Sequence, residues 1–211
     1  MKVLSLNVGK PADLVYGKKV VQSGIRKTPV HESVFLSKTG FEGDGQADLV
    51  HHGGEDKAVC VYPQEHYAYW EEVLQQPLPP AAFGENITAA GLLEETVHIG
   101  DIFQLGEAVV QISQPRQPCF KLAARYKEPK LALFVKETGY TGFYFRVRTE
   151  GFVSADSRLK RIQSHPAAIT IQKANQIMDS SDSDVRDIKK LLEVEELAES
   201  WKEELSKRIN L

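Results

Sequence analysis

The feature that most constrains the fold is a change in hydrophobic pattern at residues 164–166, where short apolar runs give way to a helical repeat. Before that point, brief apolar and β-branched runs alternate with turn residues, which is typical of strands. Two segments interrupt this pattern with helical spacing, one from Pro63 to Leu74 and one around residues 130–138. The predicted strands cover residues 3–8, 18–21, 30–36, 58–62, 102–105, 108–113, 145–149 and 158–162.

Many short strands with few helices favour an irregular β-barrel of mixed kind over a doubly wound parallel sheet. Gly-acid pairs at residues 43–44, 100–101 and 106–107 are expected to turn hairpins between strands. We therefore predict an α+β fold that is mainly β. A barrel is expected over residues 1–164 and a three-helix tail over residues 165–211.

In the tail, Thr170 is expected to cap the first helix, and the polar turn at residues 179–184 is rich in residues that begin helices. Three short helices are also found in helix-turn-helix modules that read DNA. This segment, however, carries ten acidic and seven basic residues, whereas a DNA-binding module needs a basic face. We expect no DNA binding. The apolar tail residues are instead expected to cap the barrel, form a homodimer or dock an electron donor.

The predicted inward-facing positions of the tail follow helical spacing. They are Ile171, Ala174, Ile177 and Met178 in the first helix; Val185, Ile188, Leu191 and Leu192 in the second; and Leu197, Trp201, Leu205 and Ile209 in the third.

Composition narrows the class of protein further. Two cysteines among 211 residues do not make a disulfide framework, and this usage suits a reducing compartment. No apolar run approaches the length of a membrane span, and the N-terminal apolar run is short for a signal peptide. We expect a soluble cytoplasmic protein without membrane contact.

The strongest functional signal is Cys119. It follows Gln114-Pro115-Arg116-Gln117-Pro118, in which two prolines restrict the backbone, and it precedes a helix expected from Phe120. The unpaired amides and positive dipole end of a helix N-terminus favour a thiolate. A cysteine there, near Arg116, suits a metal ligand or a nucleophile. The alternative is a buried structural cysteine.

Three other segments carry polar groups that suit ligand binding. Residues 24–30 place Arg26, Lys27 and Thr28 in a turn that could bind phosphate. Residues 43–54 combine glycines with His51 and His52, but neighbouring strand residues face opposite ways, so we expect no zinc.

The loop at residues 83–88 offers Glu85 and Asn86 as partners for the edge of a heterocycle. Together with Cys119, these three segments predict a pocket for an anionic heterocycle that presents a metal to sulfur.

Three motifs occur in this order along the chain: GIRKTPV, GDGQADLVHHGGEDKAVCVYP and FGENITAAGLLEETVHIGDIFQLGEAVVQISQPRQPC. With them, the sequence resembles the MOSC (molybdenum cofactor sulfurase C-terminal) domain family, in its YiiM-type bacterial branch. The resemblance covers about residues 2–162, and the tail is similar to the three-helix domain of that branch. It implies a MOSC-type barrel that binds the molybdenum cofactor, a molybdenum-pyranopterin.

The resemblance also implies roles for single residues. Cys119 matches the cysteine that ligates molybdenum, Lys27 and Thr28 match the pair near the cofactor phosphate, and Asn86 matches a pterin contact. Arg116, His52 and Glu85 are further expected cofactor contacts, without a specific role for the last two. Asp101 matches a motif position of unassigned role, and Cys60 is expected to be a small buried strand residue.

The activity implied by the resemblance is reduction of N-hydroxylated bases and amines, a detoxification of hydroxylaminopurine-type analogues. Since two cysteines are too few for an iron–sulfur cluster, electrons are expected from an external flavoprotein or reductase. A cofactor or sulfur carrier, with Cys119 as a persulfide, is the alternative. A cysteine acyltransferase is a third possibility, but the spacing of His51 and His52 does not support it.

Overall fold

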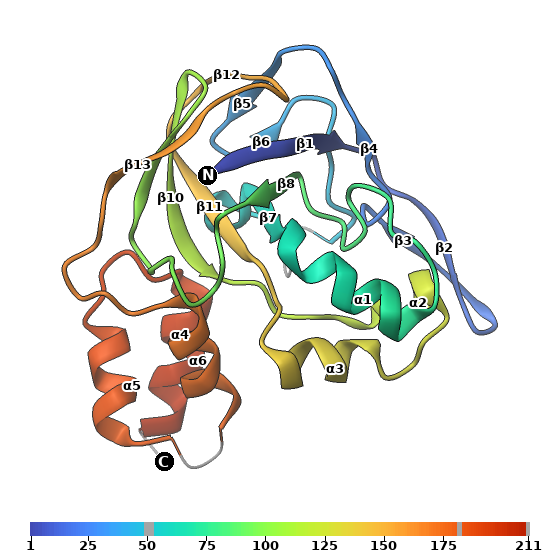
Figure 1. The fold of residues 1–211 in the computed structure, drawn as a ribbon. Helices are drawn as coiled ribbons and strands as arrows, with labels where there is room; N and C mark the ends of the chain where they lie inside the picture. Colours follow the sequence, from blue (N-terminus) through green and yellow to red (C-terminus); the bar gives the residue numbers. More distant parts are fainter. Residues whose placement is uncertain (49–52, 181–182, 210–211) are drawn as a thin grey trace.

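The computed structural model describes residues 1–48, 53–180 and 183–209. Its main feature is a curved sheet of eight strands that forms a half-barrel (Figure 1). Every pairing in it is antiparallel except that of β7 with β8. The order is β13 (Leu159–Gln163), β9 (Ile102–Leu105), β10 (Ala108–Pro115), β11 (Phe143–Thr149), β7 (Val59–Pro63), β8 (Ile87–Ala90), β1 (Lys2–Val8) and β4 (Thr28–Pro29).

Two smaller sheets and a single bridge complete the β structure. Lys2 bridges Arg158, so the start of β1 meets the chain just before β13 and the curved sheet comes close to closing. The smaller sheets contain β12 (Gly151–Val153), β5 (Val34–Ser37) and β6 (Gly40–Phe41) in one, and β2 (Ala12–Tyr16) and β3 (Lys19–Ser23) in the other. The predicted α+β class with an irregular barrel and a helical tail is confirmed.

The strand predictions differ from the structure in several places. The predicted strand at residues 30–36 is present only from Val34, and the sequence reasoning missed β2, β4, β6, β8 and β12. Gly106-Glu107 does close the hairpin between β9 and β10, with Gly106 at a φ of 57° that favours glycine. The pairs at residues 43–44 and 100–101 do not join paired neighbouring strands.

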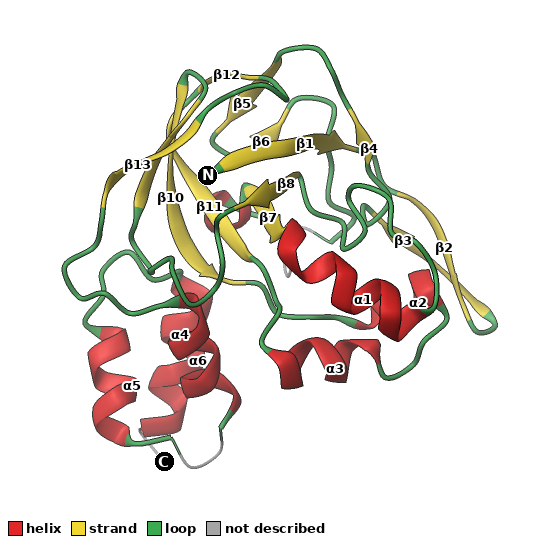
Figure 2. Ribbon diagram, viewed as in Figure 1, coloured by secondary structure: helices red, strands yellow, loops and turns green. Residues whose placement is uncertain are grey.

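Three helices lie together on one side of the sheet (Figure 2), and their buried residues form a second core that includes Trp70. They are α1 (Tyr67–Leu74), α2 (Phe120–Tyr126) and α3 (Leu131–Thr138). The helix expected from Pro63 starts later, because Pro63 is the last residue of β7 and a 3-10 turn, η2 (Gln64–His66), intervenes. Inside this core, Trp70 Nε1 donates to the Tyr62 hydroxyl at 2.6 Å, so the indole is satisfied without water.

The tail forms α4 (Ile171–Asp179), α5 (Val185–Leu192) and α6 (Glu199–Ile209). The Thr170 side chain accepts a hydrogen bond from Lys173 N, which is the expected cap. Ile171, Ile188 and Trp201 belong to the same hydrophobic core as the sheet, so the tail covers the barrel of its own chain. Val185 was predicted to face inward but is 50% exposed.

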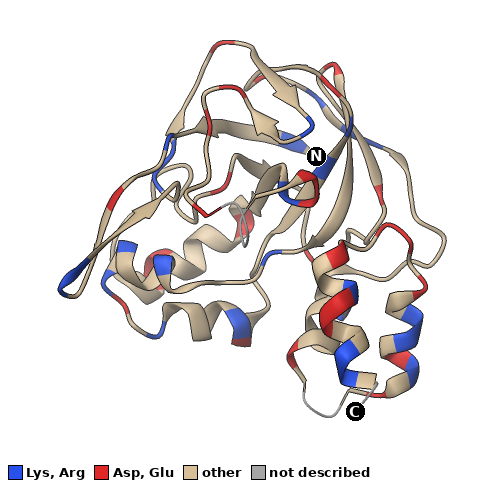
Figure 3. Cartoon of the chain, turned by 180° about the vertical axis from the view of Figure 1, so that it is seen from behind, with Lys and Arg blue, Asp and Glu red and all other residues tan. Residues whose placement is uncertain are grey.

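Charge on the tail is mixed rather than one-sided, since acidic and basic residues interleave on its helices (Figure 3). None of the helices in the described part of the chain combines the length and apolar character needed to cross a bilayer. The division into residues 1–164 and 165–211 stays a prediction, as does a homodimer.

Candidate functional site

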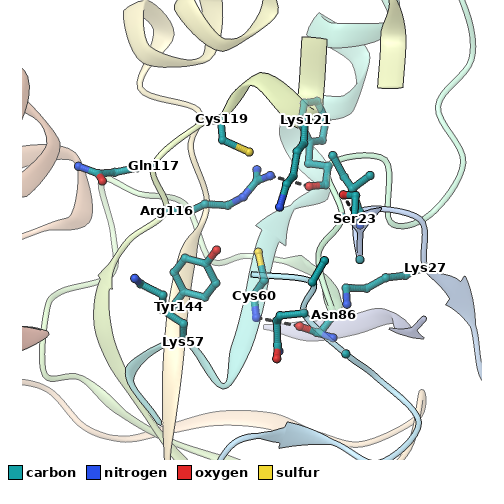
Figure 4. Close-up of a pocket in the computed structure, with 17 residues that line it drawn as sticks. Ser23, Lys27, Lys57, Cys60, Asn86, Arg116, Gln117, Cys119, Lys121 and Tyr144 are labelled. Atoms are coloured by element: carbon teal, nitrogen blue, oxygen red, sulfur yellow. Dashed lines mark hydrogen bonds between the residues drawn. The ribbon is translucent and has the colours of Figure 1, made fainter. Parts of the chain in front are cut away.

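An open pocket lies where the ends of several elements meet (Figure 4). Its walls come from β7 and β11 of the sheet, from the loop that leads into α2, and from three further loops. The lining residues are Ser23, Gly24, Ile25, Lys27, Gly45, Gln46, Ala47, Lys57, Cys60, Phe83, Gly84, Asn86, Arg116, Gln117, Cys119, Lys121 and Tyr144.

Cys119 lies at the N-cap of α2, where the chain changes from extended to helical backbone. Its carbonyl accepts a hydrogen bond from Leu122 N at 3.1 Å, while its side chain makes no capping hydrogen bond. The thiol is half-buried and points into the pocket (Figure 4). The structure therefore leaves the sulfur available to a ligand inside the pocket.

Arg116 lies between the thiols of Cys119 and Cys60 (Figure 4). Its Nη2 donates to the carbonyl oxygen of Phe83 at 2.7 Å, but its Nη1 is buried and has no hydrogen-bond partner. Burial alone would lower the pKa of Arg116, but the neighbouring Cys60 and Tyr144 groups raise it overall. A permanently charged guanidinium with a free donor is suited to bind an anion.

Three lysines add positive charge to the pocket wall: Lys27, Lys57 and Lys121. Burial lowers the pKa of Lys57, with Asp56 acting against this shift. Lys27 forms a buried ion pair with Asp44, which also accepts a hydrogen bond from Gly9 N at 2.9 Å. Among the described lining residues none is acidic, so the pocket favours an anionic ligand.

Cys60 lies on β7 directly opposite Tyr144 on β11. It is a buried strand residue, as expected, and burial raises the pKa of its thiol to about 11. The same burial raises the pKa of the Tyr144 phenol. Cys60 also lines the pocket, which the sequence reasoning did not anticipate. Because its thiol strongly prefers the protonated form, Cys60 is poorly suited to bind a metal.

The Asn86 side chain mainly forms hydrogen bonds that join β7 and β1 to the loop that carries Asp44. Its Oδ1 accepts from Cys60 N at 3.1 Å, and its Nδ2 donates to Asp44 Oδ2 at 2.8 Å and to Asn7 O at 3.3 Å. Asn86 lines the pocket, but its amide is already bonded on both ends. It fixes the position of the wall and of the Lys27-Asp44 pair.

Two of the predicted contacts are not brought to the pocket. Glu85 is fully buried, where it accepts hydrogen bonds from Tyr67 Oη, Thr88 Oγ1 and Phe83 N. Thr28 is exposed in β4 and pairs with Val8. Neither is among the residues that line the pocket.

The remaining candidates are His51, His52 and Asp101. His51 and His52 fall outside the described residues. Asp101 is fully buried away from the pocket lining, where it accepts from His98 N at 3.0 Å and from His165 N at 2.8 Å. It thus joins the barrel to the start of the tail and acts as a structural carboxylate.

Close backbone contacts shape the pocket wall. Gly84 has a φ of 80°, and a Cβ there would lie 2.9 Å from Ile25 Cγ1. A Cβ on Gly24 would lie 2.3 Å from the carbonyl oxygen of Gly45. Larger residues at these two positions would push the loops apart and distort the pocket.

Sequence reasoning missed Lys57, Lys121 and Tyr144 as pocket residues. Lys57 lies three residues before Cys60 in the motif GGEDKAVC, and Lys121 lies two residues after Cys119. That proximity was the available signal for the two lysines. Tyr144 gave no local signal, because only the pairing of β11 with β7 brings it to the site.

Comparison with known families matches both parts of the chain. A model of the MOSC domain matches residues 48–160, and a model described as a YiiM-like, 3-alpha helix domain matches residues 169–210.

Individual relatives match to different extents. An uncharacterized protein, YflK of Bacillus subtilis (strain 168), is 53% identical over 98% of this chain and 93% of its own. The crystal structure of YiiM from Geobacillus stearothermophilus superposes with a TM-score of 0.85 at 39% identity, covering 99% of this chain and 98% of that one. A protein of Gibberella moniliformis (strain M3125 / FGSC 7600) described as a reductase is 38% identical over 62% of this chain, which corresponds to 24% of that protein.

Proposed function

The chain belongs to the MOSC domain family, with a YiiM-like three-helix domain after it, and on this premise we propose that its pocket binds a molybdenum cofactor. We further propose that the protein is a reductase of N-hydroxylated bases and amines. The observation that supports this best is the meeting of the Cys119 thiol with the buried, partly unpaired guanidinium of Arg116 in one basic pocket.

The residues present fit such a cofactor. A pyranopterin carries a phosphate, and Arg116, Lys121 and Lys27 supply cations for it along the pocket wall. Arg116 Nη1 is the buried donor that lacks a partner. In the described residues, no three His, Cys, Asp or Glu side chains gather as a metal site. The proposal therefore gives the metal one protein ligand, the Cys119 sulfur.

The structure also refines which residues the proposal assigns to the phosphate. Of the expected Lys27-Thr28 pair, only Lys27 faces the pocket, and its charge is partly balanced by Asp44. Within the part of the chain that the structure describes, Arg116 forms no such ion pair with an acidic side chain. We therefore assign the main anion contact to Arg116, with Lys27 as a supporting contact.

When bound, the cofactor would supply the two-electron chemistry that cleaves an N–O bond. Converting a hydroxylamine to an amine takes up two electrons and two protons and releases water. Burial lowers the pKa of Lys57, so its ammonium gives up a proton more readily than an exposed lysine, and we assign it proton delivery. Tyr144, whose pKa is raised by burial, stays protonated and can orient the substrate by hydrogen bonding.

The source of electrons is proposed to be another protein. Both cysteines of the chain line this pocket, which leaves none for an iron–sulfur relay. An external flavoprotein or reductase is the proposed donor. The partial match to a protein described as a reductase supports this class of reaction.

The assay that tests the function uses protein purified from a molybdenum-replete host, a chemically reduced viologen dye and 6-hydroxylaminopurine. We expect dye oxidation coupled to adenine formation, with two dye electrons per product. Cofactor-loaded protein that oxidises no dye and forms no adenine would contradict the reductase and favour the carrier that holds a persulfide on Cys119.

A further inference from the structure

We propose that the first turn of α6 holds the backbone around the cofactor pocket in place through hydrogen bonds, with Asp56 as the positioning residue that connects the two. We call this set of contacts the brace. The brace itself follows from contacts within the chain, while its role in cofactor binding rests on the proposed function. The tail helices would then have a task beyond covering the barrel core. They would hold the two segments that carry Lys57 and the Arg116–Cys119 loop.

The start of α6 donates two backbone hydrogen bonds to the barrel. Glu199 N donates to Asp56 Oδ2 at 3.1 Å, and Ala198 N donates to the carbonyl oxygen of Ser113 at 3.0 Å. The first amides of a helix have no partner inside the helix, so these acceptors satisfy groups that otherwise need water. The Asp56 carboxylate also lies at the positive end of the helix dipole, where a negative charge is favoured.

Two further side chains donate hydrogen bonds to Asp56. The Arg146 guanidinium on β11 donates to Asp56 Oδ1 through Nε at 2.9 Å and through Nη2 at 2.6 Å. The Ser113 hydroxyl on β10 donates to the Asp56 carbonyl oxygen at 2.6 Å. Lys57, the next residue, lines the pocket, and both lie in the short turn η1 (Glu55–Lys57). The position of the Lys57 backbone is thus set by α6, β10 and β11 together.

The same turn of α6 reaches the segment that leads to the sulfur. Ser113 and Gln114 are buried near the end of β10, which closes with Pro115 immediately before Arg116. The Ser200 hydroxyl contacts Gln114 Oε1 at 3.4 Å, and Gln114 Nε2 donates to the Pro115 carbonyl oxygen at 3.1 Å. One helical turn therefore contacts both segments that deliver pocket residues.

No residue of α6 lines the pocket among those described, so the proposed effect is indirect. It acts by restricting two backbone segments, which lowers the entropy lost when a ligand is bound. A loss of the brace is expected to loosen these segments without removing any group that contacts the ligand. This distinguishes the brace from a contact residue.

A pair of substitutions at one position separates the backbone bond from the side chain. Glu199→Pro removes the N–H that Asp56 accepts, and proline is tolerated at the first position of a helix. Glu199→Ala removes the exposed side chain but keeps that N–H. Val185→Pro, at the first position of α5, controls for proline in the tail at a site far from Asp56 in the sequence.

The readout is amide hydrogen exchange of the full-length protein, which does not depend on the cofactor. Loss of a hydrogen bond to a charged group changes the equilibrium between closed and open states by roughly tenfold. We therefore expect amide exchange in residues 53–60 and 114–121 to be about tenfold faster in Glu199→Pro. Glu199→Ala and Val185→Pro should match the parent there. Unchanged exchange in Glu199→Pro, or an equal increase in Val185→Pro, would overturn the brace.

The molybdenum content of the same variants then tests whether the brace supports cofactor binding. We expect occupancy to fall about threefold or more in Glu199→Pro and to stay at the parent level in Glu199→Ala. Faster exchange with full occupancy would overturn the link to binding. If the parent itself carries no cofactor while the exchange difference is present, the brace stands and the proposed function fails.

Discussion

Cys119→Ser is expected to abolish reduction of N-hydroxylated substrates while leaving the fold unchanged. A hydroxyl is neither as acidic nor as soft as a thiol, so serine is a poor replacement for a sulfur ligand to the metal. Loss of a group that hydrogen-bonds to a metal ligand lowers metal affinity or activity by about 10–100-fold. Loss of the protein ligand itself should therefore lower the activity by more than about 100-fold. The Cys119 side chain makes no capping bond, so stability should change little.

Cys60→Ser is the matched control, since both cysteines line the same pocket. Its thiol is buried on β7, so a hydroxyl there needs a new partner and we expect stability to fall by about 1–3 kcal/mol. Turnover per bound cofactor should persist. The measurement is dye-coupled activity normalised to molybdenum content, with the melting temperature recorded in parallel. Parental activity in Cys119→Ser would rule out the proposed ligand.

The second large effect is expected for Arg116→Gln. Glutamine stays polar but lacks the positive charge and the length of arginine, so it also loses the contact of Arg116 Nη2 with the Phe83 carbonyl. We expect cofactor content to fall by about tenfold or more, because a charge-assisted contact in a buried setting contributes more than a neutral one. Cofactor content is measured as molybdenum and as released pterin per folded chain.

Arg125→Gln provides its control. Arg125 Nη1 also donates to backbone carbonyls, those of Ile25 at 2.6 Å and Ala81 at 2.8 Å, but Arg125 does not line the pocket. We expect this variant to lose stability and to keep its cofactor. If Arg116→Gln keeps full cofactor as well, the phosphate is bound elsewhere in the pocket and the assignment to Arg116 is wrong.

Local sequence signals predicted those features that depend on a few neighbouring residues. The apolar run at residues 108–113 predicted a strand, which the structure extends to Pro115, and the run after Cys119 predicted the helix that starts at Phe120. The caps of the tail helices follow equally local chemistry, with Thr170 and Asp184 bonding amides two or three residues ahead. These parts needed no knowledge of distant contacts.

The composition of the pocket could not be predicted in the same way, because it depends on which strands pair. Tyr144 meets Cys60 only because β11 lies beside β7, although 84 residues of sequence separate them. Glu85 and Asn86 are adjacent, yet one faces the core and the other the pocket wall. Sequence alone indicated two polar residues in a loop but not which side chain faces the ligand.

Direct measurement of molybdenum and pterin in the purified full-length protein tests the central claim most closely. Protein made in a molybdenum-replete host should contain close to one molybdenum and one pterin per chain, and Arg116→Gln should lose both together. Folded parent protein from the same host that contains neither would contradict the proposed cofactor site, whatever its activity with dyes.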